Sequence, residues 1–193
     1  MQLKILYLNN HKSIFKRFFI LELSFKKMAI FFKFIISHSY IYLKMQKIKY
    51  DTKDSICACK VSLDILGDKW SLIIVRDIFK EKTTFSEFLY ESDEGISSNI
   101  LVDRLKKLIS LEIIDFIREP EDKKIKKYYL TDRGIDLYGV IYELQLWTIN
   151  NVDFKYSPNT SKWKNFSSLN SKEQVISHYQ NTYRKLRLKR FNH

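Results

Sequence analysis

Apolar residues recur at helical spacing from about residue 60 onward, and their pattern predicts the elements of an ordered domain. The stretch VSLDILGDKWSLIIVRDIF indicates two helices separated at Gly67, with Asp68 placed to cap the second. The stretch TTFSEFLYES opens with a capping box, because Thr84 can cap a short helix and Glu87 can reach back to the Thr84 amide. We therefore predict two helices followed by a short third one.

The letters EGI after the short helix predict a turn, and Ser97 or Ser98 then caps a longer helix that runs to about residue 110. Beyond this helix the apolar period changes to two. IIDFIRE and KIKKYYLT, joined by the turn PEDK, indicate a β-hairpin over residues 113–131. The hairpin is followed by one long helix over residues 132–150, which Thr131 caps.

This long helix, DRGIDLYGVIYELQLWTINN, is apolar on two sides. One stripe holds Ile135, Tyr138, Ile141, Tyr142 and Gln145, and the other holds Leu137, Val140, Leu144 and Trp147. A helix that is apolar over so much of its surface packs with one side on its own domain and with the other on a partner. The candidate dimer-interface residues are Leu137, Ile141, Leu144 and Trp147.

The order of these elements predicts a mainly α-helical fold with a small β-hairpin, which is a dimeric winged helix-turn-helix protein. The helices over 84–91 and 97–110 form the helix-turn-helix unit, and the hairpin forms the wing. We assign the DNA-binding domain to residues 45–156, between an atypical basic and apolar extension at 1–44 and a C-terminal extension at 157–193.

The stretch GISSNILVDRLKKLISLEII, residues 95–114, has the features of a helix that reads DNA. The second helix of such a unit meets base edges with its N-terminal residues, where small hydrogen-bonding side chains permit close approach. Leucines at i, i+4 and i+7 face the core, which leaves the opposite face for DNA. The predicted contacts are Ser98 and Asn99 at base edges, Val102 and Lys106 on the same outer face, Ser97 at the start of the helix, and Arg104 and Lys107 at phosphates.

Other lysines extend this predicted contact set. The hairpin supplies Lys123, Lys124 and Lys126, and the second helix supplies Lys69. Acidic residues in the hairpin dilute its charge. A solvated surface helix explains the stretch 95–114 better when the stretch is taken by itself, but the capped helix before it and the lysine-bearing hairpin after it favour DNA recognition.

The composition narrows the class of protein. The chain has 193 residues and is 45% hydrophobic, which is enough for one domain with a real core, and its 4 Gly and 2 Pro favour long helices. The net charge of +12 divides into +7 over residues 1–44, +5 over residues 181–193 and none between. DNA would therefore bind the middle through local patches. The four histidines lie outside the predicted domain and no Gly-rich phosphate loop is present, so we predict no enzyme, no cofactor and no metal site.

Both extensions have open interpretations. Residues 1–44 contain no apolar run long enough to span a bilayer, and we interpret them as upstream sequence, with Met45 as the start of the functional protein. The alternative is a basic amphipathic segment that lies on a membrane surface. In the other extension, SPNTSKWKNFSSLN predicts a loop, and Ser171 then caps a basic helix that packs on the dimer. Alternatively, the cations from Arg184 to Arg190 contact phosphates.

From about Cys57 to about Val152 the chain resembles the HxlR-type bacterial transcription regulators, relatives of the MarR group. The matching residues are Cys57, Leu63-Asp64, Gly67-Asp68-Lys69-Trp70, Ile96-Ser97, Leu101, Arg104-Leu105-Lys106, Leu108, Tyr128, Leu130-Thr131, Gly134 and Trp147. Two departures stand out, because Ala58 replaces a usual proline and Asp68 replaces a glycine. A third is Glu112, which replaces a glycine that often needs a left-handed backbone, at a cost of roughly 1 kcal/mol.

The resemblance implies a homodimer, and our leading hypothesis is that it regulates transcription as a repressor. The resemblance implies an interface formed by the helices over 60–67 and 132–150, and a double-stranded, pseudo-palindromic DNA operator as partner. It also implies a thiol function, because several family members sense oxidants or electrophiles at the position of Cys57. Cys57 and Cys59 are therefore the redox-sensing candidates, with Lys60 nearby to favour a thiolate, and the effector would be a small oxidant or electrophile.

Several alternatives remain at this stage. The two cysteines can be ordinary reduced thiols that sense nothing. Two cysteines form no disulfide framework, so we expect a cytoplasmic protein, and we expect no stable membrane insertion. The protein can also be a non-regulatory nucleic-acid-binding protein, or a membrane-surface protein anchored by residues 1–44. A thiol redox enzyme is disfavoured, because no strand-first thioredoxin-like pattern accompanies the Cys-x-Cys sequence.

Overall fold

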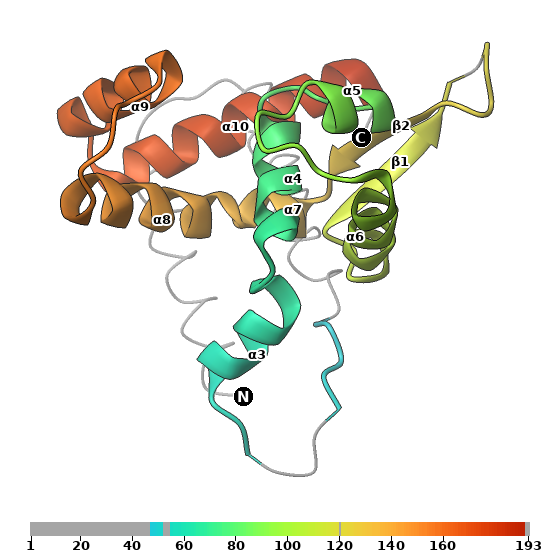
Figure 1. Cartoon of the computed structure of the whole chain (residues 1–193), viewed down its shortest axis with the longest axis horizontal. Helices are drawn as coiled ribbons and strands as arrows, with labels where there is room; N and C mark the ends of the chain where they lie inside the picture. The colour runs from blue at the N-terminus through green and yellow to red at the C-terminus, as the bar shows by residue number, and fades with distance from the viewer. Residues whose placement is uncertain (1–46, 52–54, 120, 192–193) are drawn as a thin grey trace, which may run out of the picture. The chain divides into compact units, whose positions relative to one another are not determined.

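The computed structural model of the protein describes residues 47–51, 55–119 and 121–191 (Figure 1). The chain divides into two units, Met1–Ile48 and Lys49–His193, and the fold described below is that of the second unit. The predictions for residues 1–44, including the start at Met45, fall outside the described residues. Among the residues that are described, no helix is both long enough and apolar enough to cross a bilayer.

The second unit is mainly helical and contains one two-stranded antiparallel sheet, as the sequence predicts. Its elements are α3 (Ala58–Leu66), α4 (Lys69–Phe79), α5 (Phe85–Tyr90), α6 (Ser98–Ser110), β1 (Ile114–Arg118), β2 (Lys126–Leu130), α7 (Asp132–Asp136), α8 (Tyr138–Asn151), α9 (Pro158–Leu169) and α10 (Lys172–Phe191). Helices α5 and α6 form the helix-turn-helix unit and the β1–β2 hairpin forms the wing. The predicted winged helix-turn-helix fold is confirmed.

Helices α4 and α5 begin at the capping residues that the sequence predicts. The Asp68 carboxylate accepts hydrogen bonds from the amides of Trp70 and Ser71 at the start of α4. Thr84 and Glu87 form the predicted capping box of α5. The prediction for α6 is wrong in detail, because Ser97 occupies the N-cap position but its side chain makes no capping bond. The first amides of α6 therefore have no side-chain acceptor from Ser97.

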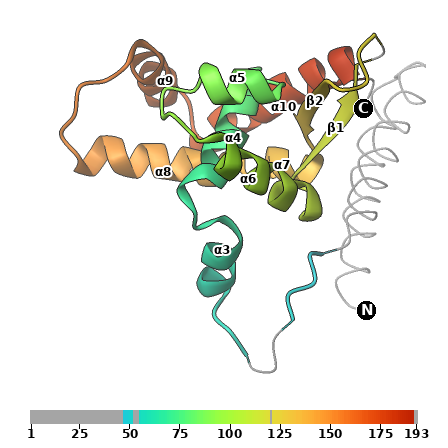
Figure 2. The ribbon, with the colours of Figure 1, turned by 45° about the vertical axis from the view of Figure 1, so that its right-hand side comes forward.

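One core joins the helix-turn-helix unit to the wing. Leu101, Leu105 and Leu108 of α6 are buried, as their spacing predicts, and pack with residues of α4, α5, the hairpin and α7. In the hairpin, Ile114 pairs with Leu130 and Arg118 pairs with Lys126. The hairpin lies beside α6 in both ribbon views (Figures 1 and 2). The wing and the second helix of the unit are therefore held by shared packing.

The C-terminal region differs from the prediction in two places. The expected single helix over 132–150 is interrupted at Leu137, which separates α7 from α8. The expected loop after Ser157 is helix α9, because Ser157 accepts a hydrogen bond from the Thr160 amide and proline suits the first helical position. The buried Trp163 holds α9 in place by donating from Nε1 to the Tyr138 hydroxyl at 3.2 Å.

The predicted second capping box and the amphipathic helix after it are both present. The amide of Gln174 donates to Ser171 Oγ, and the amide of Ser171 donates to Gln174 Oε1 at 2.8 Å. Val175 and Tyr183 on the apolar face of α10 are buried in the protein's own domain. The helix therefore packs on the domain that precedes it in the chain.

Candidate nucleic-acid interface

Helix α6 separates its residues into a buried face and an exposed face. The three leucines lie inward, whereas Ser98, Asn99, Val102 and Lys106 are exposed. Val102 exposes 40% of its surface. It therefore adds an apolar side chain to an exposed face that is otherwise polar. The structure thus brings these predicted contact residues together on one solvent-facing surface, and their role in DNA contact stays a prediction.

Arg104 and Lys107 have a partner within the protein, which the sequence analysis did not foresee. Arg104 Nε lies 2.8 Å from Asp68 Oδ1, and Lys107 Nζ lies 3.0 Å from Asp68 Oδ2. Burial acts to raise the pKa of Asp68, but hydrogen bonds from Ser71, Lys107 and Arg104 outweigh it and hold that pKa well below its usual range. The N-terminal cap of α4 therefore also holds α6, and it pairs with two cations predicted to contact phosphates, one of which, Arg104, also pairs with Asp103.

A charged network fixes the turn before α6. Asp77, which is 1% exposed, accepts hydrogen bonds from Arg76, from Lys82 Nζ at 3.1 Å and from Ser92 Oγ at 3.0 Å. Arg76 also donates to both oxygens of Glu94, at 2.5 and 2.9 Å. This contact lowers the pKa of Glu94 to about 2. Sequence reasoning missed the network because its members lie up to 18 positions apart and belong to no repeating pattern.

Backbone geometry at two positions sets the directions of the chain around α6. Gly95 has a φ of 64° in the turn before the helix, a conformation that glycine adopts readily. Glu112 has a φ of 53° just after the helix, so the left-handed conformation expected at this position is present. The chain therefore enters the wing through a left-handed residue although a glutamate stands at this position.

Two lysines of the wing are exposed, and two others contact groups within the hairpin. Lys123 and Lys124 are exposed near the tip of the hairpin. The Lys126 ammonium lies 4.1 Å from the centre of the Phe116 ring. Lys127, which the sequence places in the same basic run, is paired with a glutamate on the opposite arm of the hairpin. The wing therefore presents a smaller basic surface than its lysine count indicates.

Lys69 of α4 and Tyr90 of the helix-turn-helix unit are also exposed. Lys69, at the start of α4, stands with its ammonium 4.5 Å from the centre of the Trp70 ring. Tyr90, at the end of α5, exposes 80% of its surface. No periodic signal in the sequence marks Tyr90, because it is exposed at the end of a short helix.

The two cysteines lie at the start of α3. Cys57 holds the N-cap position and Cys59 lies in the first turn, and both are exposed and form no disulfide. Lys60 Nζ lies 3.1 Å from Asp64 Oδ2. The lysine that we expected to favour a thiolate is therefore paired with a carboxylate. Among the described residues no group of His, Cys, Asp and Glu could hold a metal ion.

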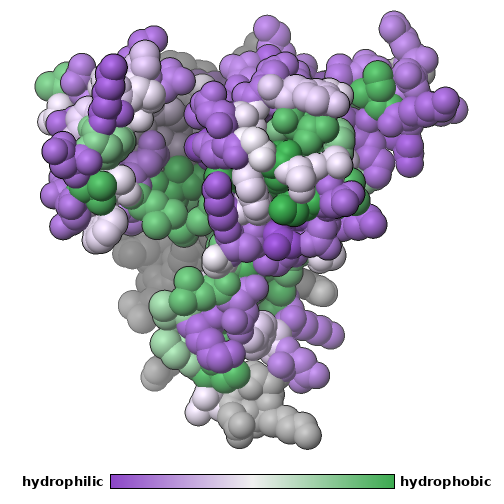
Figure 3. All heavy atoms as spheres, viewed as in Figure 1, coloured by the Kyte–Doolittle hydropathy of each residue, from purple (hydrophilic) through white to green (hydrophobic). Residues whose placement is uncertain are grey.

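The predicted dimer residues divide between the core and the surface. Ile141 is 6% exposed and packs in its own core, and Leu137 packs against the same core. Leu144 and Trp147 expose 51% and 62% of their surfaces. Apolar surface is visible over α8 and α3 in Figure 3, and α3 contributes Leu63, which is 62% exposed. We therefore remove Ile141 from the candidate interface.

The helix-turn-helix unit, the adjoining wing and the exposed polar face of α6 define a winged helix-turn-helix protein. A model of the HxlR-like helix-turn-helix family matches residues 65–156. The Bacillus subtilis transcriptional regulator YodB is 31% identical over 86 residues, which cover 45% of this chain and 76% of YodB. The chain belongs to the HxlR-like helix-turn-helix family.

Other similarities extend over a part of each chain. A helix-turn-helix transcriptional regulator of Mycobacterium tuberculosis is 30% identical over 86 residues, which cover 45% of this chain and 53% of the relative. The chain thus spans about half the length of its mycobacterial relatives. The solved structure of reduced YodB is 27% identical to this chain, covers 51% of this chain and 97% of its own, and has a TM-score of 0.43. The quinone-bound structure of YodB is 29% identical, covers 49% of this chain and 99% of its own, and has a TM-score of 0.40.

Proposed function

We propose that this protein is a sequence-specific DNA-binding transcriptional regulator, and that it represses transcription as a homodimer. The exposed face of α6 carries the proposal, because Asn99 and Lys106 stand on it while buried leucines hold the helix from behind. Asparagine can bond adenine through two atoms, and lysine can bond guanine or a phosphate. Exposed lysines of the wing lie on the element that follows α6 and would add phosphate contacts.

The exposed apolar side chains of α8 support the homodimer. Leu144 and Trp147 are large apolar residues on the solvent side of a helix whose other side is buried. Such a surface favours association with a second copy. A dimer would place its two α6 helices in successive major grooves about 34 Å apart, on a pseudo-palindromic operator.

The exposed thiols support regulation by a small oxidant or electrophile. Cys57 and Cys59 are accessible at the start of α3, on the N-terminal side of the helix-turn-helix unit. The relative YodB has been solved with a bound quinone, which is an electrophile. Modification of a thiol at the start of α3 would change the surface that this helix offers to the proposed dimer.

The DNA proposal is tested by selecting a duplex from a randomised library and measuring the binding of single variants to it. Asn99→Ala should lose about 1–3 kcal/mol of discrimination at one base pair. Lys106→Ala should weaken binding and reduce the salt dependence by about 0.9 if it contacts a phosphate. Lys162→Ala removes the same charge from α9 and is the matched control. Folded Asn99→Ala and Lys106→Ala proteins that bind as tightly and selectively as the parent would contradict the proposal.

The effector proposal has a separate test. Alkylation of the reduced protein should lower its affinity for the selected duplex, and Cys57→Ser should abolish that response while retaining binding. Cys59→Ser tells whether the second thiol contributes. An alkylated protein with unchanged affinity would remove the thiol function and leave the DNA function standing.

A further inference from the structure

We propose that helix α10 is a brace for the wing, and that Tyr183 and Arg187 are the residues that position the hairpin. The proposal rests on the proposed DNA binding for its functional consequence. Helix α10 lies outside residues 65–156, which the family model matches, so the brace is an addition to the shared fold. Its interaction surface is the outer edge of β2.

The outer edge of β2 has backbone groups that no strand pairs. β2 pairs with β1 on one side, and on the other side the Tyr128 amide donates to the Thr83 carbonyl at 2.7 Å. Farther along the same edge, the Leu130 amide donates to the Tyr183 hydroxyl at 3.0 Å, and Arg187 donates to the Leu130 carbonyl at 3.0 Å. Unpaired edge groups need partners. Two side chains of α10 thus take the place of a further strand at Leu130.

Contacts on both sides of Leu130 reinforce this attachment. Arg187 also donates to Asp132 at 2.7 Å, so one guanidinium spans the end of β2 and the start of α7. The Phe191 ring lies 5.0 Å from the ring of Tyr129, the residue before Leu130. Leu130 is fully buried and Tyr183 is 3% exposed, so the hydrogen bond between them is shielded from water.

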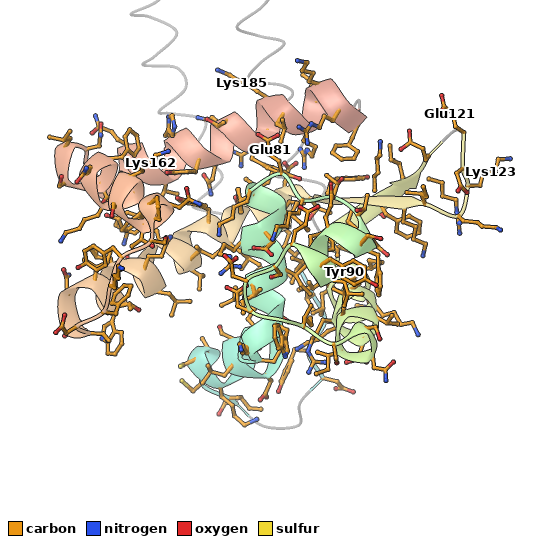
Figure 4. All side chains as sticks on the ribbon, turned by 45° about the horizontal axis from the view of Figure 1, so that its top comes forward. Glu81, Tyr90, Glu121, Lys123, Lys162 and Lys185 are labelled. Atoms are coloured by element: carbon orange, nitrogen blue, oxygen red, sulfur yellow. The ribbon has the colours of Figure 1, made fainter. Side chains whose placement is uncertain are left out.

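The other part of α10 rests on a separate element. The rings of Tyr179 and Tyr138 stack with centroids 4.7 Å apart, which joins α10 to α8. Val175, one turn earlier, is fully buried in the same cluster. Figure 4 shows α10 running from the region of α9 toward the base of the hairpin. The helix therefore spans from the second hydrophobic cluster to the wing, as a brace requires.

The brace has a consequence for DNA binding because a two-stranded hairpin is marginally stable by itself. The exposed Lys123 and Lys124 lie near its far end, so a small change at the base moves them relative to α6. Loss of the Tyr183 contact would leave the buried Leu130 amide without an acceptor and loosen the hairpin. Phosphate contacts from the wing would weaken as a result.

Two hydroxyl deletions on the same helix test the proposal. Tyr183→Phe removes the acceptor for Leu130, and Tyr179→Phe removes the same atom one turn earlier, where the ring stacks on α8. Hydrogen exchange should be about tenfold faster across β1 and β2 in Tyr183→Phe, with α4 and α6 unchanged. Tyr179→Phe should leave the exchange of the hairpin as in the parent. Equal hairpin exchange in the parent and Tyr183→Phe would overturn the brace, whether or not the protein binds DNA.

Affinity for the selected duplex is measured with each tyrosine variant in two backgrounds, the parent and Lys123→Ala/Lys124→Ala. Tyr183→Phe should weaken binding roughly two- to tenfold in the parent, the range of one hydrogen bond. It should have no effect where the tip lysines are already absent. A purely structural role would lower affinity equally in both backgrounds, and that result would overturn the proposal. A parent that binds no duplex would overturn the proposed function, while the exchange experiment would still decide the brace.

Discussion

Glu112 adopts a left-handed backbone conformation that glycine would adopt at lower cost. Its φ is 53°, and its side chain, which is 73% exposed, pairs with Arg133 at 3.0 Å. An ion pair this exposed contributes little to stability. The backbone cost of a non-glycine residue in this conformation is roughly 1 kcal/mol. The balance at this residue therefore favours glycine.

Glu112→Gly is expected to raise the free energy of unfolding by about 0.5–1 kcal/mol, because it relieves the backbone and gives up a weak ion pair. Urea denaturation at neutral pH measures the change. Glu112→Ala is the control, since it loses the same ion pair and keeps the strained backbone. A Glu112→Gly protein no more stable than Glu112→Ala would show that strain is not the determining factor.

Glu94 makes a pH-dependent contribution at the turn before α6. The hydrogen bond from Arg76 lowers its pKa to about 2, from an ordinary value of 4.5. A carboxylate with a lowered pKa stabilises the fold fully above its ordinary pKa and loses that contribution as the pH falls through the lowered one. The contribution is on the order of 1–3 kcal/mol for a side chain that is 22% exposed.

Glu94→Gln should therefore be less stable than the parent by about 1–3 kcal/mol at neutral pH. The difference should shrink between pH 4.5 and pH 2 as the parent loses its charged carboxylate. Thermal unfolding across this range measures it. Glu91→Gln, an exposed glutamate in the same loop, serves as the control. A difference that does not change with pH would contradict the assignment to ionised Glu94.

At the scale of elements, Asp68 connects α4 and α6, two helices that are far apart in the sequence. It caps α4 and pairs with Arg104 and Lys107 of α6, so the orientation of the proposed recognition helix depends on the start of α4. The same contact limits how many cations α6 offers to DNA. A phosphate at this position would have to compete with a carboxylate that is already in place.

Asp68→Asn should keep an N-cap acceptor, free Lys107 from its ion pair and leave Arg104 paired with Asp103 alone. We expect the salt dependence of DNA binding to become steeper by about 0.9 for each cation that then contacts a phosphate. Binding measured from low to moderate salt gives this slope. Asp64→Asn, which removes a carboxylate from α3, is the matched control. An unchanged slope in Asp68→Asn would mean that Arg104 and Lys107 lie away from the DNA backbone.

For the whole molecule, the exposed apolar surface of α8 is the feature that bears on the proposed dimer. Tyr138 and Tyr142 on one side of the helix are buried, whereas Leu144 and Trp147 are exposed. Isolated apolar residues on a surface are common, whereas several on one helix support the proposed association with a second copy. The stability and the DNA affinity of the protein would then depend on its concentration.

Trp147→Asp should convert the proposed dimer to a monomer and weaken binding to a two-site operator at least about tenfold, because a monomer holds one half-site. Sedimentation velocity measures the oligomeric state. Leu169→Asp changes an apolar residue of α9 that is 83% exposed and serves as the control for added charge. A parent that sediments as a monomer would contradict the homodimer directly.

Much of the fold could be predicted because its determinants are local. The caps at Asp68, Thr84 and Thr131 and the leucine spacing of α6 are read within a few residues. The loop prediction at 157–170 is wrong although Ser157 and Pro158 are local signals of a helix start, and the contact of Trp163 with the distant Tyr138 is what packs α9 on the domain. For the candidate site, the exposed face of α6 followed from periodicity. The partners of Arg104 and Lys107 did not, because Asp68 lies 36 and 39 positions away.

The sequence by itself determined the order of helices and strands, the buried stripe of α6 and the family of the chain, because helix caps, apolar periods and signature spacings act over short distances. The tertiary structure alone decided which charges remain available and what holds the wing. Asp68 reaches α6, Arg76 reaches Glu94, and α10 reaches β2 across separations of 18 to 57 positions. Such contacts depend on the three-dimensional path of the chain, which no local pattern encodes.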